Sequence, residues 1–590
     1  MTDATEEAGA AKHRQAVVVI HGMGEQRPMA TLRSFVEAVW VADRRKAGEC
    51  RKYWVVPDSR TGSAELSRIT TSADNGVRTD FYEFYWADIM QGTTLQHLRA
   101  WIFGLLLRWP HHVPSDVWWA WVWLWVVTLL TVALAAEGLF GVFSSGLVKT
   151  TVDVANGSSA EAGWTTKTET GVVVGAVVSG GLFYVLAKRL LREKRRTVLS
   201  GGFILLAAAF AFVGIGFLLP WQSILTVSVV MLLLSSAIGI LVHQLVVPYL
   251  GDVARYVRSE PDTVQKRREI RERGLALLRA LHREAPPATP KEGEGAGESD
   301  QKGLEEPERY ERIVVVGHSL GSIIAYDLLR LFWLEAGPSR DRPMEQPVHS
   351  ALGDLVTFLE TGPDLHDEAV LSTYRELQRA VSRAMAAESA ASSDDGPLTW
   401  RISDFITLGC PLTHAEFLLA RDVDRLQKLV EERQIATSPP LSNGPGTCDF
   451  RYQPGDDGAH ARNVAKVAPD GLPHHAAMFA ATRWTNIYDR HSPFRVWRGD
   501  IVSGPVQGKP AAEGSQAEPG MGLGIRDRPV RIRRPNPVFP GATRFFTHTL
   551  YWDCDVEAEL LSGEIADAYR SGHGPEHVKV LREAMALDDR

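Results

Sequence analysis

The segment Arg312-Ile-Val-Val-Val-Gly-His-Ser-Leu-Gly-Ser322 decides the fold that we expect. Its β-branched run predicts a buried strand, and Ile323–Arg330 directly after it predicts a helix. Between them lies Gly-His-Ser-Leu-Gly, the only G-x-S-x-G pattern in the chain. Gly317 and Gly321 let strand and helix approach without a Cβ clash, so Ser319 is expected on a tight turn with its hydroxyl exposed. This context favours a nucleophilic serine over a buried structural one.

A second apolar strand is predicted at Ala16–Ile20, and it runs directly into His21-Gly22-Met23. Together, this His-Gly strand end and the serine turn resemble the α/β-hydrolase superfamily, and within it the serine lipases and esterases. The resemblance implies a mostly parallel sheet with helices on both faces. It also implies that the backbone amides of Met23 and Leu320 form an oxyanion hole. The motif residues that carry the resemblance are His21, Gly22, Gly317, His318 and Gly321.

Later segments are similar to the remaining parts of the same superfamily. Asp404–Leu412 resembles the strand after the nucleophile helix, and Trp484–Tyr488 resembles the next strand. Phe545–Trp552 is similar to the terminal histidine segment of the family. The resemblance therefore implies that His548 is the general base, in the chain order Ser…Asp…His.

Two aspartates compete for the role of triad acid. Asp489 directly ends the strand at Trp484–Tyr488. Asp500 lies in Gly-Asp-Ile-Val-Ser-Gly, which resembles the acid turn of related lipases after a short insertion. We favour Asp500 as the acid and keep Asp489 as the alternative.

Long uncharged stretches predict that the chain crosses a membrane. Val117–Ala136, Thr170–Ala187 and Thr197–Gly251 contain no Asp, Glu, Lys or Arg. One bilayer span needs roughly 20 apolar residues, so we expect four transmembrane helices. Their predicted bounds are about 117–136, 170–187, 198–219 and 224–247.

Basic residues beside the expected spans predict their orientation. The link 188–196 and the segment after the last span are rich in Lys and Arg, whereas the other two links are not. Positive charge marks the cytoplasmic side. We therefore expect a multi-pass protein of the cell membrane with both termini and the hydrolase domain in the cytoplasm.

The expected domain organisation is a hydrolase domain split by the membrane block. Its N-terminal part is 1–98, and its C-terminal part is 309–590. Between them we predict an interfacial helix and the four spans in 99–251, a basic juxtamembrane helix in 252–284 and a flexible linker in 285–308. The leucines of the basic helix (Leu275, Leu278, Leu281) share one side, which favours either a membrane-surface helix or a solvated one.

Charge and cysteine content exclude several classes of protein. The 590 residues include 64 basic and 71 acidic side chains, a net charge of −7, which argues against a general nucleic-acid binder. Four widely spaced cysteines suit neither a disulfide framework nor a zinc site and indicate free thiols in a reducing compartment. We expect no metal and no cofactor.

The sequence thus predicts a membrane-anchored serine hydrolase that cleaves ester bonds of lipid or acyl substrates through a Ser-His-Asp triad. An acyltransferase or thioesterase with the same triad is one alternative. A non-catalytic membrane protein that binds a ligand with the hydrolase fold is another. The expected partners are the lipid bilayer and a membrane lipid or acyl ester, and the sequence indicates no particular protein partner.

Overall fold

The computed structural model describes residues 13–23, 27–41, 51–58, 60, 66–90, 121, 125, 253, 256–257, 261–283, 309–339, 344–390, 398–420, 422–442, 448–452, 471–490, 499–500, 502–508, 520–532, 547–553 and 575–587. The chain divides into two compact units. Met1–Gly92 and Arg255–Arg590 form one, which we call the sheet unit, and Thr93–Ala254 forms the other.

The four expected membrane spans fall almost wholly outside the described residues. Only Trp121 and Trp125 of the first span are described. Both are helical, and their indole rings make an edge-to-face contact with centroids 6.3 Å apart. The interfacial helix expected near 99–109 and the linker 285–308 also lie outside the described part. Among the described residues, no helix combines the length and apolar character that a membrane crossing requires.

The sheet unit is built on one eight-stranded sheet, drawn from both parts of the chain that form the unit. Its order is β2-β3-β4-β1-β5-β6-β7-β8, and every pair from β4 to β8 is parallel, whereas β3 runs antiparallel to both neighbours. The strands are β1 (His13–Ile20), β2 (Tyr53–Pro57), β3 (Ser67–Thr71), β4 (Val77–Phe84), β5 (Arg312–His318), β6 (Ile402–Leu408), β7 (Arg483–Asp489) and β8 (Arg526–Val530).

The central strands are apolar on both sides because helices cover both faces of the sheet. Val17, Val19, Val314 and Val316 face one core, which the helices α1 (Ala30–Val36) and α18 (Glu576–Met585) help to close. The alternate residues face α9 (Pro261–His282) and α11 (Leu320–Ala336). Such continuous β-branched runs are typical of parallel strands that are buried on both faces. The predicted α/β class, a mostly parallel sheet with helices, is therefore confirmed.

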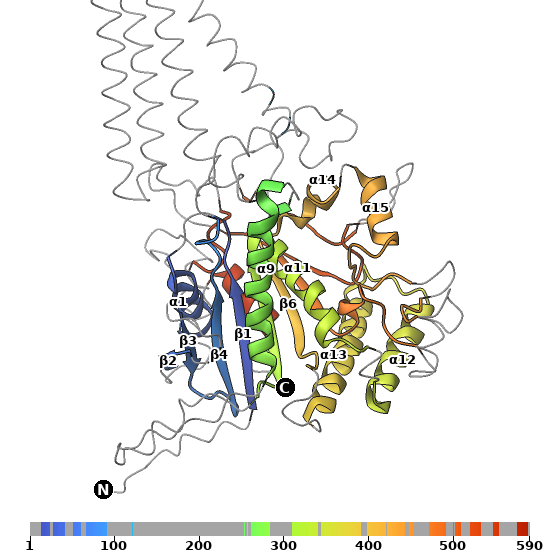
Figure 1. Cartoon of the computed structure of the whole chain (residues 1–590), viewed down its shortest axis with the longest axis horizontal. Coiled ribbons are helices and arrows are strands. Elements are labelled where there is room, and N and C mark those ends of the chain that lie inside the picture. The colour runs from blue at the N-terminus through green and yellow to red at the C-terminus, as the bar shows by residue number, and fades with distance from the viewer. Residues whose placement is uncertain are drawn as a thin grey trace, which may run out of the picture. The chain divides into compact units, whose positions relative to one another are not determined.

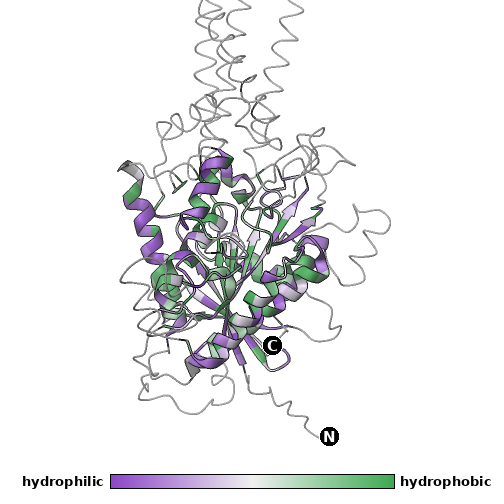
Figure 2. Cartoon of the chain, turned by 90° about the vertical axis from the view of Figure 1, so that its right-hand side faces the viewer, coloured by the Kyte–Doolittle hydropathy of each residue, from purple (hydrophilic) through white to green (hydrophobic). Residues whose placement is uncertain are grey.

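The helices place their polar residues outward. In Figure 1, α9 lies in front of the sheet and runs along the strands, with α11 beside it. Figure 2 shows hydrophobic residues concentrated along the strands and hydrophilic ones on the outer sides of the helices. The described residues of the sheet unit also include α12 (Gln346–Glu360), α13 (Glu368–Ala390), α14 (Ala415–Leu418) and α15 (Val423–Glu431), with single turns at Glu37–Val41, Pro411–His414 and Met478–Ala480.

Helix α9 corrects one sequence-based interpretation. Its leucine side is neither on a membrane surface nor in solvent, because Leu278 and Leu281 are buried within the sheet unit. Gly274 allows this close packing, since a Cβ atom there would lie 2.4 Å from a methyl carbon of Leu328 in α11. Arg271 and Tyr256 also bind the carboxylate of Asp327 on α11. Within the basic helix expected in 252–284, the described segment α9 is thus packed into the folded core.

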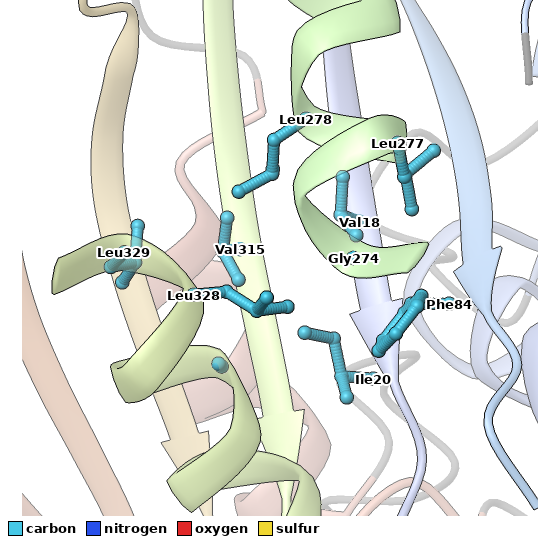
Figure 3. A pocket seen from close by; sticks show the side chains of 10 residues that line it. Val18, Ile20, Phe84, Gly274, Leu277, Leu278, Val315, Leu328 and Leu329 are labelled. Atoms are coloured by element: carbon cyan, nitrogen blue, oxygen red, sulfur yellow. The ribbon is translucent and has the colours of Figure 1, made fainter. Parts of the chain in front are cut away.

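A small apolar cavity lies between α9, α11 and the sheet (Figure 3). Its volume is about 10 Å³, and its lining is wholly apolar, with Ile20, Leu278 and Leu328 among the side chains. A site of this size has room for about one water molecule, and an apolar one stays dry. The cavity is too small for an acyl chain, so we assign it no role in substrate binding.

Candidate active site

Ser319 occupies a strained turn between β5 and α11. Its backbone has φ 53° and ψ −126°, a region that non-glycine residues rarely adopt and that is seen where a site holds a residue under strain. Gly321 lets the helix start against β1, because a Cβ atom there would lie 2.4 Å from the carbonyl oxygen of Ile20. The amide of Ser319 donates to the carbonyl of Leu408 at the end of β6. The turn is therefore held from both neighbouring strands.

Three side chains form one hydrogen-bonded line at this turn. Nε2 of His548 lies 2.7 Å from Oγ of Ser319, and Nδ1 of His548 lies 2.8 Å from Oδ2 of Asp500. The carboxylate of Asp500 only accepts hydrogen bonds, so Nδ1 carries the proton, and Nε2 of the neutral ring accepts from the serine hydroxyl. All three residues are buried, with 1%, 3% and 0% exposure, so the expected exposed hydroxyl of Ser319 is not what the structure has. Gly22 lies directly against Ser319 and helps to cover it. This is the geometry of a nucleophile, a base and an orienting acid.

The carboxylate of Asp500 is stabilised in its charged form. Its Oδ1 accepts from the amide of Val502, while its Oδ2 accepts from the hydroxyls of Ser503 and Tyr551 as well as from His548. Burial alone would raise its pKa, but His548 and these donors hold the pKa of Asp500 well below its ordinary value. Asp500 is therefore an acceptor for His548 at any pH near neutrality.

The alternative acid, Asp489, is directed elsewhere. It ends β7 as predicted, but its Oδ2 accepts from the hydroxyl of Thr547 at 2.7 Å, and its amide donates to the hydroxyl of Tyr551. No hydrogen bond joins it to His548 among the described contacts. Burial raises the pKa of Asp489 to about 6. The structure thus brings Asp500, and not Asp489, to the histidine.

The predicted oxyanion residues flank Ser319. Gly22 lies directly against the turn, because a Cβ atom on it would be 3.0 Å from Cβ of Ser319. Met23 follows it and is buried. Leu320 is the first residue of α11, where backbone N–H groups have no partner inside the helix. Amides in these two positions can donate to a negative charge that develops beside Ser319.

His21 and His318 are structural supports of the site. Nδ1–H of His21 donates to the carbonyl of Gly22, and the ring stacks on Trp86 with centroids 5.0 Å apart. Nε2–H of His318 donates to the carbonyl of His548 at 2.7 Å. Burial lowers the pKa of His21 to about 4 and that of His318 to about 3. Both rings are therefore neutral near pH 7 and hold backbone in place.

Three neighbours of the triad were given no role from sequence. Tyr551 and Ser503 both donate to Asp500, and Gly409, with φ 60°, covers the triad at the end of β6. A Cβ atom on Gly409 would lie 2.8 Å from the ring of Tyr551 and 3.1 Å from both Oδ2 of Asp500 and Cε1 of His548. In the sequence, the only indication of these two roles is that Tyr551 follows His548, and Ser503 follows Asp500, by three residues.

Gly409→Ala is expected to lower the ester turnover that the sequence predicts by roughly 10-fold or more, because the new methyl group must displace parts of the triad. The left-handed backbone adds about 1–2 kcal/mol of strain. Turnover and thermal midpoint of the purified protein are to be measured together. The control is Gly353→Ala in α12, where a Cβ atom meets nothing within 4 Å. Unchanged turnover in Gly409→Ala would contradict the close packing on the triad.

Among the described residues, no group of three His, Cys, Asp or Glu side chains could hold a metal ion. Comparison with protein-family models, with curated proteins and with solved structures finds no match to this chain.

Proposed function

We propose that this protein is a serine hydrolase of the α/β-hydrolase type that cleaves carboxylic esters. The observation that carries the proposal is the continuous line from Oγ of Ser319 through His548 to Oδ2 of Asp500, with distances of 2.7 and 2.8 Å. The strained conformation of Ser319 and the chain order Ser…Asp…His add support.

The proposed reaction uses only groups of this chain, the ester and water. Oγ of Ser319 attacks the ester carbonyl carbon while its proton passes to Nε2 of His548. Amides of Met23 and Leu320 donate to the resulting oxyanion. When the tetrahedral adduct collapses, the alcohol leaves with the proton from Nε2. Water then gives a proton to Nε2 and attacks the acyl carbon. When this second adduct collapses, Oγ of Ser319 leaves with the proton from Nε2 and the acid is released, which restores Ser319 and the neutral imidazole.

The proposed substrates are membrane lipids or other acyl esters. The support is the set of long uncharged stretches in 117–251, which the sequence indicates as four bilayer spans. An enzyme anchored in a bilayer meets substrates that partition there. We propose that the sheet unit faces the cytoplasm, on the side of the basic link 188–196.

The proposed chemistry is tested with a fluorophosphonate probe on the detergent-solubilised full-length protein. Such a probe phosphonylates a serine that a neighbouring base activates, with fluoride as the leaving group. We expect one labelled peptide, which contains Ser319. Absence of labelling, or labelling of a different serine, would count against an active triad and favour a ligand-binding protein.

The proposed topology is tested with single added cysteines. A cysteine in place of Gly157 is expected to react with an impermeant maleimide added to intact cells, and a cysteine in place of Glu193 is not. The parent protein with its own four cysteines gives the background. Reaction at 193 with protection at 157 would invert the proposed orientation.

A further inference from the structure

The hydroxyl of Tyr551 lies between the two buried aspartates of the site. It is 2.7 Å from Oδ2 of Asp500 and 3.0 Å from the backbone nitrogen of Asp489. Tyr551 is 1% exposed. Its ring packs against Gly409, where a Cβ atom would lie 2.8 Å from the ring. Its phenol is therefore held by packing as well as by hydrogen bonds.

The direction of the hydrogen bond from Tyr551 follows from its partners. The amide of Asp489 can only donate, so the phenol oxygen accepts there. The single phenol proton is then left for the carboxylate of Asp500, which can only accept. Burial next to Asp500 raises the pKa of Tyr551 well above its ordinary value, so this proton stays in place.

Ser503 supplies a second donor to the same oxygen. Its hydroxyl is 2.7 Å from Oδ2 of Asp500 and 3.0 Å from the hydroxyl of Tyr551. With Nδ1–H of His548, three donors converge on Oδ2, and the amide of Val502 occupies Oδ1. These contacts leave the carboxylate one orientation, and in it Oδ2 faces the histidine.

We infer that Tyr551 and Ser503 are positioning residues that hold Oδ2 of Asp500 on Nδ1 of His548. They also set the pH below which His548 is already protonated and cannot accept the proton of Ser319. The inference rests on the proposed hydrolase function. The physical reason is that each hydroxyl withdraws negative charge from the carboxylate, and a less negative partner stabilises the protonated imidazole less strongly. Removal of a hydroxyl should therefore make the base retain its proton up to a higher pH.

Other titratable groups also face this network among the described residues. His318 and His21 lie on the side of the serine turn and are neutral, since burial lowers the pKa of each to about 3 and about 4. Asp489 at the end of β7 and Glu576 of α18 interact with each other, and Asp489 interacts with Asp500. Burial raises the pKa of Asp489 to about 6, so this aspartate can titrate in the range of the measurement.

The test compares Tyr551→Phe with the full-length parent protein, using a soluble ester over a range of pH. We expect kcat to fall roughly 10- to 100-fold with little change in KM, because the acid is displaced rather than the substrate. We also expect the acid limb of kcat/KM to move upward by about 0.5 pH unit or more. The comparison is repeated in an Asp489→Asn background, which removes the competing titration.

The matched control is Tyr326→Phe in α11. The hydroxyl of Tyr326 is also buried and exchanges two hydrogen bonds with the backbone of Ala436, but it does not contact Asp500. Tyr326→Phe should therefore leave the acid limb of kcat/KM at the pH of the parent protein. Ser503→Ala should move the limb in the same direction as Tyr551→Phe, and it replaces that variant if Tyr551→Phe does not fold.

An unmoved acid limb in both Tyr551→Phe and Ser503→Ala would overturn the inference, even if turnover falls. A parent protein whose ester turnover does not depend on Ser319 would overturn the proposed function instead. The two failures are distinguishable, because the first requires an active parent protein and the second concerns the parent alone.

Discussion

Ser319→Ala is expected to reduce ester turnover by about 10⁶-fold, to the level of the remaining binding and oxyanion contributions. The variant keeps His548 and Asp500 but has no oxygen 2.7 Å from Nε2, so no acyl-enzyme can form. The loss should appear in kcat and should be accompanied by complete loss of fluorophosphonate labelling.

The fold should survive this change. Ser319 contributes no side-chain cap to α11, and alanine removes a single oxygen from a turn that is held by its backbone. Circular dichroism and the thermal midpoint check this directly. Ser372→Ala, which removes a hydroxyl from α13 where it binds Arg526, is the control and should retain activity. Turnover by Ser319→Ala near the parent level would remove Ser319 from the mechanism.

Asp500→Asn is expected to lower kcat by about 10⁴-fold while the protein remains folded. The reason is the number of donors that meet this side chain. Oδ2 accepts three hydrogen bonds, and Oδ1 accepts from the amide of Val502, so an NH₂ group in either position faces a donor. The amide side chain therefore cannot hold the proton of His548 on Nδ1 as the carboxylate does.

Asp489→Asn is the matched comparison, because the same atom change occurs 11 positions earlier in the chain. Asp489 accepts from Thr547, and among the described hydrogen bonds none joins it to His548, so less than about a 10-fold loss is expected. Both variants are to be assayed on the same soluble short-chain ester. Collapse of activity in Asp489→Asn with near-normal Asp500→Asn would exchange their roles, and activity in both would remove the triad as the mechanism.

Local sequence predicted the strands and the serine turn because their signals are short-range. The runs Ala16–Ile20 and Ile313–Val316 are apolar at every position, which only a strand buried on both faces requires. The structure has β1 and β5 there, adjacent and parallel. The Gly-His-Ser-Leu-Gly turn was likewise predictable, since Gly317 and Gly321 meet backbone at distances that no Cβ atom tolerates.

The leucine side of α9 was not predictable from sequence, because periodicity identifies an apolar side and not what covers it. Leu278 and Leu281 suited a membrane surface, and the structure buries them in the sheet unit. The deciding features are distant in sequence. They include the contact of Gly274 with Leu328 and the ion pair of Arg271 with Asp327.

By itself, the sequence determined which residue types carry the proposed chemistry and in what chain order: a serine on a strand-to-helix turn, an early His-Gly strand end and a late histidine. Only the tertiary structure decided which aspartate meets His548. Asp489 ends β7 and Asp500 follows it by 11 residues, and the two differ in where the chain directs their carboxylates. It also revealed Tyr551 and Ser503 as donors to Asp500. Hydrogen bonds need atoms within about 3 Å, and separations of 48 residues between Asp500 and His548 and 229 between His548 and Ser319 are closed by the packing of the sheet.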